Sequence, residues 1–206
     1  MPGRCRKKTE GGSIQGGQMK DEIVSCELVR HLFNYDPATG CFYWTENVRL
    51  SPLKGKKAGT HNKANGYVTL NIRRKNYLAH RIAWLYMTGS FPNGDIDHID
   101  GNRANNCFSN LREATRSQNM ANLRGNAKNT SGFKGVRFVA RVKRWSAEIT
   151  ANHKRYHLGY FSSIEDAAMA YNNAAIKHFG EFARLNEVNP ESIQRIERAK
   201  QQRRVA

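Results

Sequence analysis

The sequence contains no long apolar run. Its longest apolar stretch, near residues 82–87, is far too short to span a bilayer as a helix. Residues 1–20 also lack the apolar core that a secretory signal needs. These two absences argue against a membrane partner and against export.

Cysteine is scarce, and its positions form no motif. The four cysteines are scattered, and no two of them are arranged as C-x-x-C. This spacing argues against a structural zinc knuckle and against a disulfide framework. Reduced thiols in a cytosol-like compartment are the simplest interpretation.

Acidic residues are half as frequent as basic ones. The chain of 206 residues has 17 Asp and Glu against 34 Lys and Arg, which gives a formal net charge of +17. Its length allows one large domain or two small ones. Such an excess favours nucleic acid as the partner, because Lys and Arg that neutralise phosphates release counterions. The alternative is a surface that is merely solubilising.

The first half of the chain predicts a mixture of helix and strand. Helical spacing over residues 23–33 begins near Ser25, a possible cap. Strands are expected at 41–45 and 66–72, and a strand running into a helix is expected over 77–87. Together these elements indicate an α+β domain.

The second half predicts a small, self-contained unit. After a polar linker at 124–132, three short strands and one Ala-rich helix follow, at residues 133–140, 145–151, 154–158 and 163–179. Three antiparallel strands packed on one helix make a compact α+β module. The expected division of the chain is a basic tail, a first domain, a second domain and another basic tail, at 1–22, 23–127, 128–190 and 191–206.

The most informative stretch is residues 95–119, which read DIDHIDGNRANNCFSNLREATRSQN. An Asp–His pair ends a short apolar run. A Gly/Asn loop, an N-L-R segment and a polar helix follow. Acid, imidazole, carboxamide and guanidinium groups on a very basic chain suit metal-assisted attack on a phosphodiester.

Each group in this stretch has a candidate role. His98 is the candidate general base, and Asn110 could orient its ring. Asp97 and Asn119 could hold a hard divalent cation through oxygen. Arg116, three residues before Asn119 on one face of a helix, could clamp a phosphate. Singly, a His beside an Asp or an Asn in a turn is more often structural, but the ordered set is far more specific.

The pattern D-H-I-D-G-N-x-x-x-N-N-x-x-x-N-L-R resembles the HNH endonucleases, in the subgroup of phage intron-encoded and free-standing homing enzymes. Residues 79–84 (AHRIAW) resemble the helix before their motif, so the resemblance covers about 23–123. It implies a ββα-metal core with one divalent ion, Mg²⁺ or Mn²⁺. It also implies double-stranded DNA as substrate and cleavage to 5′-phosphate and 3′-hydroxyl ends.

Carried over by position, the resemblance gives the same five residues the same roles. The last letter of HNH stands for a histidine at the final metal position, but this chain has Asn119 there. Intron-encoded nicking members also have Asn there, so single-strand nicking is the favoured outcome. Asp100 is expected to cap the turn that follows it, and His80 is expected to be structural.

The second module is itself basic. Residues 130–158 hold seven Lys or Arg against one acid, so one face of the sheet could enter a major groove. Residues 129–186 strongly resemble the Apetala-type domain of plant ethylene-response factors. The resemblance assigns DNA contacts to five sheet residues: Arg137, Arg144, Trp145, Glu148 and Arg155. His157 and Thr150 depart from the plant pattern, so the plant target sequence is not transferred.

These observations predict a two-domain, metal-dependent DNA endonuclease that acts as a monomer in the cytoplasm of a bacterial or phage-infected cell. The main alternative is a non-catalytic, sequence-specific transcription regulator with a degenerate nuclease core. An RNA-binding protein is a weaker alternative, because no aromatic-rich RNP-like strand supports it. The complete set of Asp97, His98, Asn110 and Asn119 favours the enzyme, since a degenerate core should have lost at least one.

Overall fold

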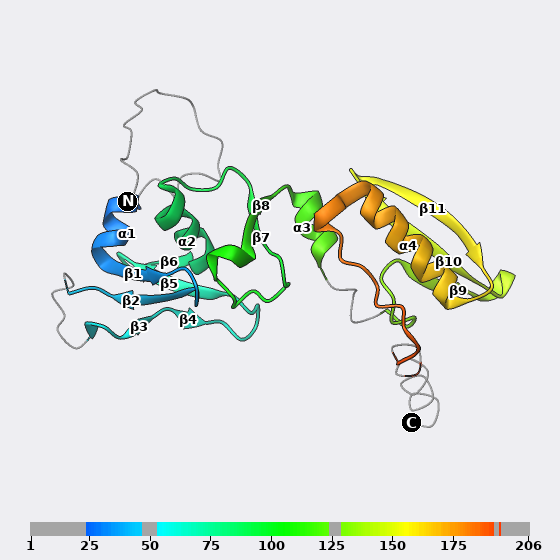
Figure 1. Ribbon diagram of the computed structural model, residues 1–206, viewed down its shortest axis with the longest axis horizontal. Coiled ribbons are helices and arrows are strands. Elements are labelled where there is room, and N and C mark those ends of the chain that lie inside the picture. Colours follow the sequence, from blue (N-terminus) through cyan, green and yellow to red (C-terminus); the bar gives the residue numbers. More distant parts are fainter. Residues whose placement is uncertain (1–23, 47–52, 124–128, 192–193, 195–206) are drawn as a thin grey trace. The chain divides into compact units, whose positions relative to one another are not determined.

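The computed structural model describes residues 24–46, 53–123, 129–191 and 194. The chain divides into two compact units, Met1–Glu113 and Ala114–Ala206. Helices and small antiparallel sheets alternate in both units, which confirms the expected α+β class (Figure 1). The tail expected at 1–22 lies outside the described residues, as does nearly all of the tail expected at 191–206.

Two three-stranded sheets and two helices build the first unit. One sheet has the order β1-β2-β3, formed by β1 (Phe33–Asp36), β2 (Cys41–Trp44) and β3 (Lys57–Ala58). The other has the order β4-β5-β6, formed by β4 (Thr60–His61), β5 (Val68–Ile72) and β6 (Lys75–Leu78). The helices are α1 (Cys26–Leu32) and α2 (Ala79–Thr88).

Local sequence explains where these elements begin and end. The Ser25 side chain accepts a hydrogen bond from Leu28 N and caps α1. Arg73 and Arg74 both have positive φ, and this allows the tight turn that joins β5 to β6. Gly89 ends α2 in the left-handed conformation. The strands expected at 41–45 and 66–72 correspond to β2 and β5, and the expected strand running into a helix corresponds to β6 and α2. These predictions are confirmed.

The first strand was not anticipated. Helical spacing was expected to continue through Phe33, but the chain becomes extended there and pairs with β2. Phe33 and Tyr35 alternate with exposed or half-buried neighbours, as one face of a strand requires. The turn at 36–40 closes this hairpin, so tertiary packing of two aromatic side chains overrides the weak helical pattern.

The core of the first unit is formed by residues from both sheets and both helices. Val29, Phe33, Leu70, Ile72 and Ile82 have almost no exposed surface. Burial of such side chains stabilises the unit by about 1.5–3 kcal/mol for each side chain. The segment that begins at residue 95 packs against this core.

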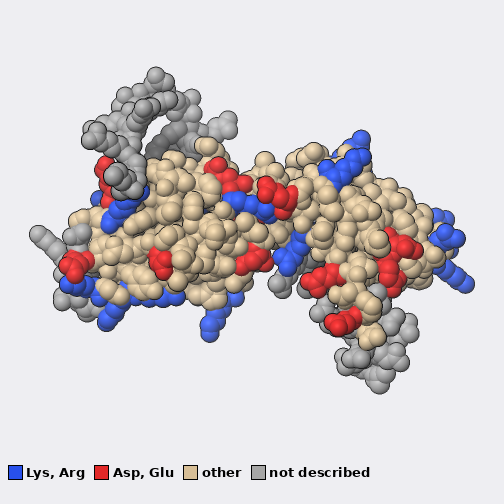
Figure 2. Space-filling view, viewed as in Figure 1, with Lys and Arg blue, Asp and Glu red and all other residues tan. Residues whose placement is uncertain are grey.

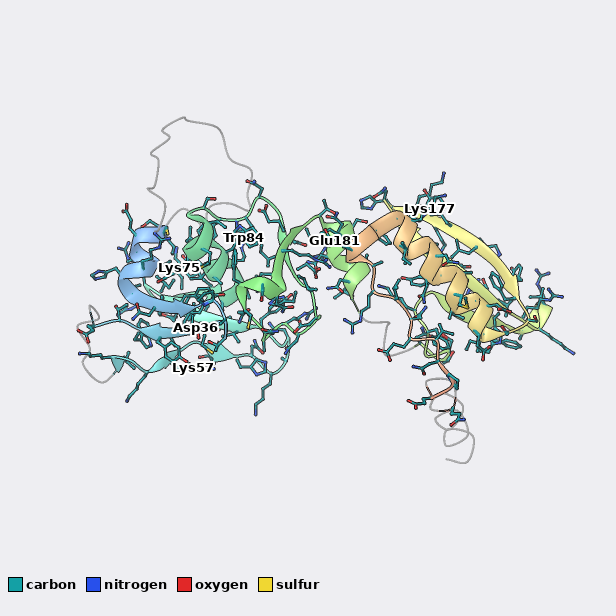
Figure 3. All side chains as sticks on the ribbon, in the orientation of Figure 1. Asp36, Lys57, Lys75, Trp84, Lys177 and Glu181 are labelled. Carbon is teal, nitrogen blue, oxygen red and sulfur yellow. The ribbon has the colours of Figure 1, made fainter. Side chains whose placement is uncertain are left out.

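A two-stranded sheet follows α2. It consists of β7 (Asp95–His98) and β8 (Leu111–Ala114), with the short 3₁₀ helix η2 (Phe108–Asn110) before β8. Trp84 of α2, labelled in Figure 3, packs on the ring of Phe108 with 5.5 Å between ring centroids. This contact ties the segment between β7 and β8 to the core of the first unit.

The second unit contains α3 (Arg116–Asn122) and the module expected from the sequence. Its sheet has the order β11-β10-β9, formed by β9 (Val136–Val139), β10 (Arg144–Ala151) and β11 (Lys154–Phe161). The helix α4 (Ile164–Phe179) lies across one face of this sheet (Figure 1). Short 3₁₀ turns complete it, η3 (Ala140–Val142) and η4 (Gly180–Phe182).

Part of the expected linker at 124–132 is integral to this module. Ser131 is 1% exposed, and its hydroxyl donates to Val136 O at 2.7 Å. Asn129 accepts hydrogen bonds from both the amide and the hydroxyl of Ser131. The prediction of a linker is therefore wrong for residues 129–132, because polar residues there satisfy buried backbone groups rather than solvent. Residues 124–128 lie outside the described part of the chain.

Surface composition agrees with the basic sequence. Figure 2 shows Lys and Arg side chains along one border of the first unit, where Lys57 of β3 projects outward in Figure 3. In the described part of the chain, no helix is both long enough and apolar enough to span a membrane. Cys26, Cys41 and Cys107 are free thiols.

Candidate active site and DNA-binding surface

The strand β7 places an acid and an imidazole side by side at its end. Asp97 and His98 are each 4% exposed, although both are polar. A buried charged group is stable only when it is paired or hydrogen-bonded. The partners of these two side chains therefore define the site.

Asp97 is paired with Arg112 of the neighbouring strand β8. Both Nε and Nη2 of Arg112 donate to the same carboxylate oxygen, Oδ2, at 3.0 and 2.8 Å. The two side chains are 5% and 15% exposed, so the pair lies away from water. Arg112 was not expected from the sequence to take part in the site. The N-L-R segment could have revealed it, as an arginine placed to pair with the acid of the preceding strand.

His98 contacts three side chains of the first unit. Its Nε2 lies 3.3 Å from Asn106 Oδ1. Its ring meets His80 edge-to-face, with 5.0 Å between centroids, and lies 6.1 Å from Tyr67. His80, expected to be structural, is thus also a wall of the site.

Burial lowers the pKa of His98, and the positive charge of Arg103 acts in the same direction. The hydrogen bond with Asn106 and the charges of Asp100 and Asp97 oppose this shift. The net effect favours neutral imidazole, which is the form that can accept a proton. His98 therefore has the chemistry of a general base near neutral pH.

Asn106 is held from the other side by the β1–β2 hairpin. Tyr35 Oη donates to Asn106 O at 2.6 Å. Gly40 has φ of +69°, and a Cβ atom there would lie 2.3 Å from Asn106 C and from Cys107 N. Only glycine allows this approach, so the hairpin fixes the residue that contacts His98.

Asn110 lies at the centre of the loop that follows β7. Its side-chain nitrogen donates to Asp100 Oδ1 and to Asn105 O, and its oxygen accepts from Asp100 N. Asp100 also accepts from Asn102 N at 2.7 Å, which agrees with its expected role as a turn cap. The loop contacts thus place Asn106 beside the His98 ring and give Asn110 the task of closing the loop. The orientation of His98 by Asn110 stays a prediction.

The other two expected nuclease residues lie on α3, in the second unit. Arg116 and Asn119 are three residues apart on this helix, as expected. Thr115 and Gln118 form a capping box that starts it. Lys134 donates through Nζ to Ala121 O and to Leu123 O, at the end of α3. Lys134 was not anticipated, because it lies in the second module far from the motif.

The sheet of the second unit presents charged side chains on the face opposite α4. Glu148 at the middle of this face pairs with Arg137 at 3.0 Å and with Arg155 at 3.3 Å. Its pKa is lowered first by the hydrogen bond from Arg137 and further by the nearby positive charges, while burial opposes the shift. The two guanidinium groups are thus held in place while remaining largely exposed.

The other two sheet residues expected to contact DNA, Arg144 and Trp145, lie in different surroundings. Arg144 is exposed at the start of β10. Trp145 is half-buried, packs against the apolar cluster under α4, and meets the ring of Phe138 at 5.1 Å. Trp145 therefore faces the helix, whereas Arg137, Glu148 and Arg155 share the open face.

A pocket of about 560 Å³ lies within the second unit, between α3 and the sheet. Its lining includes Arg116 and Ser117 of α3 together with Lys134, Arg137 and Arg155. The arginine expected to contact phosphate therefore shares a basic pocket with two arginines of the open sheet face.

The chain is similar in sequence to several known proteins. A family model described as HNH endonuclease matches residues 77–121. Protein 3.8 of Escherichia phage T7 is 35% identical over 107 residues, which cover 52% of this chain and 88% of that protein. A protein named uncharacterized HNH endonuclease L560, from Acanthamoeba polyphaga mimivirus, is 36% identical over 126 residues. These cover 61% of this chain and 65% of the mimivirus protein.

The second module matches more distantly. An AP2/ERF and B3 domain-containing transcription factor, At1g51120 of Arabidopsis thaliana, is 47% identical over 49 residues. That match covers 24% of this chain and 14% of the plant protein. No solved structure matches the chain significantly. From the family model, the phage relative and the HNH-named relative, the chain belongs to the HNH endonuclease family and is a DNA-cleaving nuclease.

Proposed function

We propose that this protein is a metal-dependent, homing-type DNA endonuclease that nicks one strand at a site chosen by its C-terminal sheet. The observation that carries the proposal is the buried Asp97–His98 pair at the end of β7. A carboxylate and an imidazole that are buried side by side, each held by a partner, are typical of a catalytic task. The family match over the same residues supports that task as DNA hydrolysis.

His98 would act on the attacking water. As the water oxygen bonds to phosphorus, Nδ1, the ring nitrogen that does not bond to Asn106, accepts its proton, and the bond from phosphorus to the 3′ oxygen breaks. The 3′ oxygen takes a proton from solvent, which leaves 5′-phosphate and 3′-hydroxyl ends. Asn106, and by prediction Asn110, would keep the ring in a productive orientation.

The donor set fits a hard cation. Among the described residues, no group of three or more His, Cys, Asp or Glu is placed to hold a metal ion. Two oxygen ligands, the Asp97 carboxylate and the Asn119 carboxamide, would leave further positions to phosphate and water. When bound, Mg²⁺ or Mn²⁺ would polarise the phosphate and stabilise the charge that develops on it. Arg112 would hold the Asp97 carboxylate in one orientation.

The second unit would supply target recognition. The open face with Arg137, Glu148 and Arg155 suits contact with base edges, and Arg144 at its rim suits contact with phosphates. The partial match to a plant AP2/ERF protein supports this reading of the sheet. Trp145 supports the sheet by packing under α4, and its expected contact with DNA stays a prediction.

A plasmid assay tests the proposal as a whole. Supercoiled plasmid carrying the target region should convert to the open circular form with Mg²⁺ or Mn²⁺, and EDTA should stop the reaction. Replacing Arg137 by Ala should weaken specific binding by about 1–3 kcal/mol if the arginine reads a base edge. Cleavage that persists in EDTA would contradict the metal mechanism. Equal weakening on all sequences would assign Arg137 to phosphates instead.

A further inference from the structure

Arg103 lies in the loop between β7 and η2, five residues after His98. Its guanidinium carbon lies 4.9 Å from the ring centroid of Tyr67, and its Nη1 donates to Asn65 O at 3.0 Å. No Asp or Glu in the described ranges forms an ion pair with it. A half-buried arginine that is held by a ring and a carbonyl keeps most of its donors for another acceptor.

The ring beneath Arg103 is also a wall of the active site. Tyr67 lies 6.1 Å from the His98 ring and 5.3 Å from the His80 ring. Arg103 and His98 therefore lie against the same aromatic ring.

A second arginine, Arg30, has the same kind of partners as Arg103 but lies in another part of the first unit. Arg30 lies over the ring of Tyr86 at 5.4 Å and donates to Tyr86 O at 2.7 Å. It thus has the same kind of partners as Arg103. Tyr86, however, packs against Tyr35 and the α1 side of the unit rather than against His98. Of these two arginines, only Arg103 lies over a ring that also neighbours His98.

We propose that Arg103 is a catalytic residue that binds a non-bridging oxygen of the scissile phosphate beside His98. Guanidinium is suited to this task because its donors match phosphate geometry and it remains charged at any working pH. Stacking on Tyr67 orients the group before DNA arrives, so little reorganisation is needed in the transition state. This inference rests on the proposed function, and it assigns the phosphate contact to the unit that carries His98.

The assignment predicts a loss of rate rather than of affinity. Arg103→Ala and Arg103→Lys should be compared with Arg30→Ala in single-turnover nicking at saturating enzyme. Affinity for uncleaved target DNA should be measured in EDTA by gel shift. We expect Arg103→Ala to slow nicking about 100-fold, as the loss of one transition-state donor does, with affinity changed less than about threefold. Arg103→Lys should retain part of the rate, and Arg30→Ala should nick within about twofold of the wild-type rate.

A modified substrate distinguishes a direct contact between Arg103 and the scissile phosphate from an indirect structural role of Arg103. A methylphosphonate at the scissile position lacks one charged non-bridging oxygen. On that substrate, the rates of the wild type and of Arg103→Ala should become similar, because the acceptor for Arg103 is missing. Thermal melting identifies any variant that does not fold, and Arg103→Lys then carries the test.

Three results are decisive. Wild-type-like nicking by Arg103→Ala overturns the assignment, and so does an undiminished difference between the two proteins on the methylphosphonate. Wild-type-like nicking by His98→Ala, run beside them, would instead contradict the proposed function. The two failures can therefore be told apart.

Discussion

Arg112 donates two hydrogen bonds to one oxygen of Asp97, Oδ2, through its Nε and Nη2. The pair spans β7 and β8, so it joins the two strands as well as orienting the carboxylate. A carboxylate in a buried site benefits from a partner that holds it in one orientation.

Replacing Arg112 by Met should lower the free energy of unfolding by about 3–5 kcal/mol, because it leaves a buried carboxylate without its partner. The matched control is Arg137→Met, which removes an ion pair whose arginine is 59% exposed. Such an exposed pair contributes about 0–1 kcal/mol. Urea unfolding of both variants measures the difference, and equal losses would show that burial of the Asp97–Arg112 pair has no energetic consequence.

His80 should make stability depend on pH. Burial, with smaller effects from His98 and Arg81, lowers its pKa to about 3, and its Nδ1 has no hydrogen-bond partner. Below pH 6.5 the unfolded chain takes up a proton at this position and the folded chain does not. Stability is therefore fully present above pH 6.5 and is lost as the pH falls toward 3.

His80→Gln should remove this contribution, which amounts to about 1.4 kcal/mol between pH 7.5 and pH 5.5. The control is the exposed His153→Gln. Unfolding in urea at the two pH values gives the comparison. A variant whose stability falls between these pH values as much as that of the wild type would show that His80 does not stay neutral in the folded state.

Lys134 should hold the end of α3 in place. Burial, together with the charge of Arg184, lowers its pKa to about 8, yet its Nζ donates to two carbonyls of α3 and its C-cap. Lys134→Met should therefore speed amide exchange in α3 at least about tenfold, because each lost charged hydrogen bond is worth about 1.5–3 kcal/mol. The exposed Lys154→Met is the control. Unchanged protection in α3 would mean that other contacts with η4 and α4 suffice.

Asp97→Ala and Asn119→Ala should each raise the concentration of Mg²⁺ needed for half-maximal nicking, or abolish nicking. Both are proposed oxygen ligands, so loss of either weakens the hold on the cation. Asn71→Ala is a suitable comparison, since its side chain bonds to Asn76 in the β5–β6 hairpin, outside the motif. A metal requirement that is identical in wild type and in Asn119→Ala would remove Asn119 from the site.

The sequence predicted the second module best. Its three strands and the Ala-rich helix are all confirmed, because local periodicity and packing agree there. The hairpin strand β1 and the anchored segment 129–132 were missed. Both depend on partners distant in sequence, which local patterns do not contain.

The candidate site was predicted in part. The sequence motif identified Asp97 and His98, which the structure buries together on β7. It did not identify Arg112 or Asn106, whose importance comes from contacts across the β7–β8 loop. Trp145, which is expected to contact DNA, also packs under α4, a contact with residues distant in sequence that the sequence pattern did not indicate.

The most direct test of the central claim compares nicking and binding by His98→Ala. A general base acts on the water, whereas phosphate contacts carry most of the affinity. We predict that the variant binds target DNA in a gel shift nearly as tightly as the wild type, and that it does not nick supercoiled plasmid in Mg²⁺. Nicking by His98→Ala at the wild-type rate would contradict the assignment of His98, and with it the account of this site.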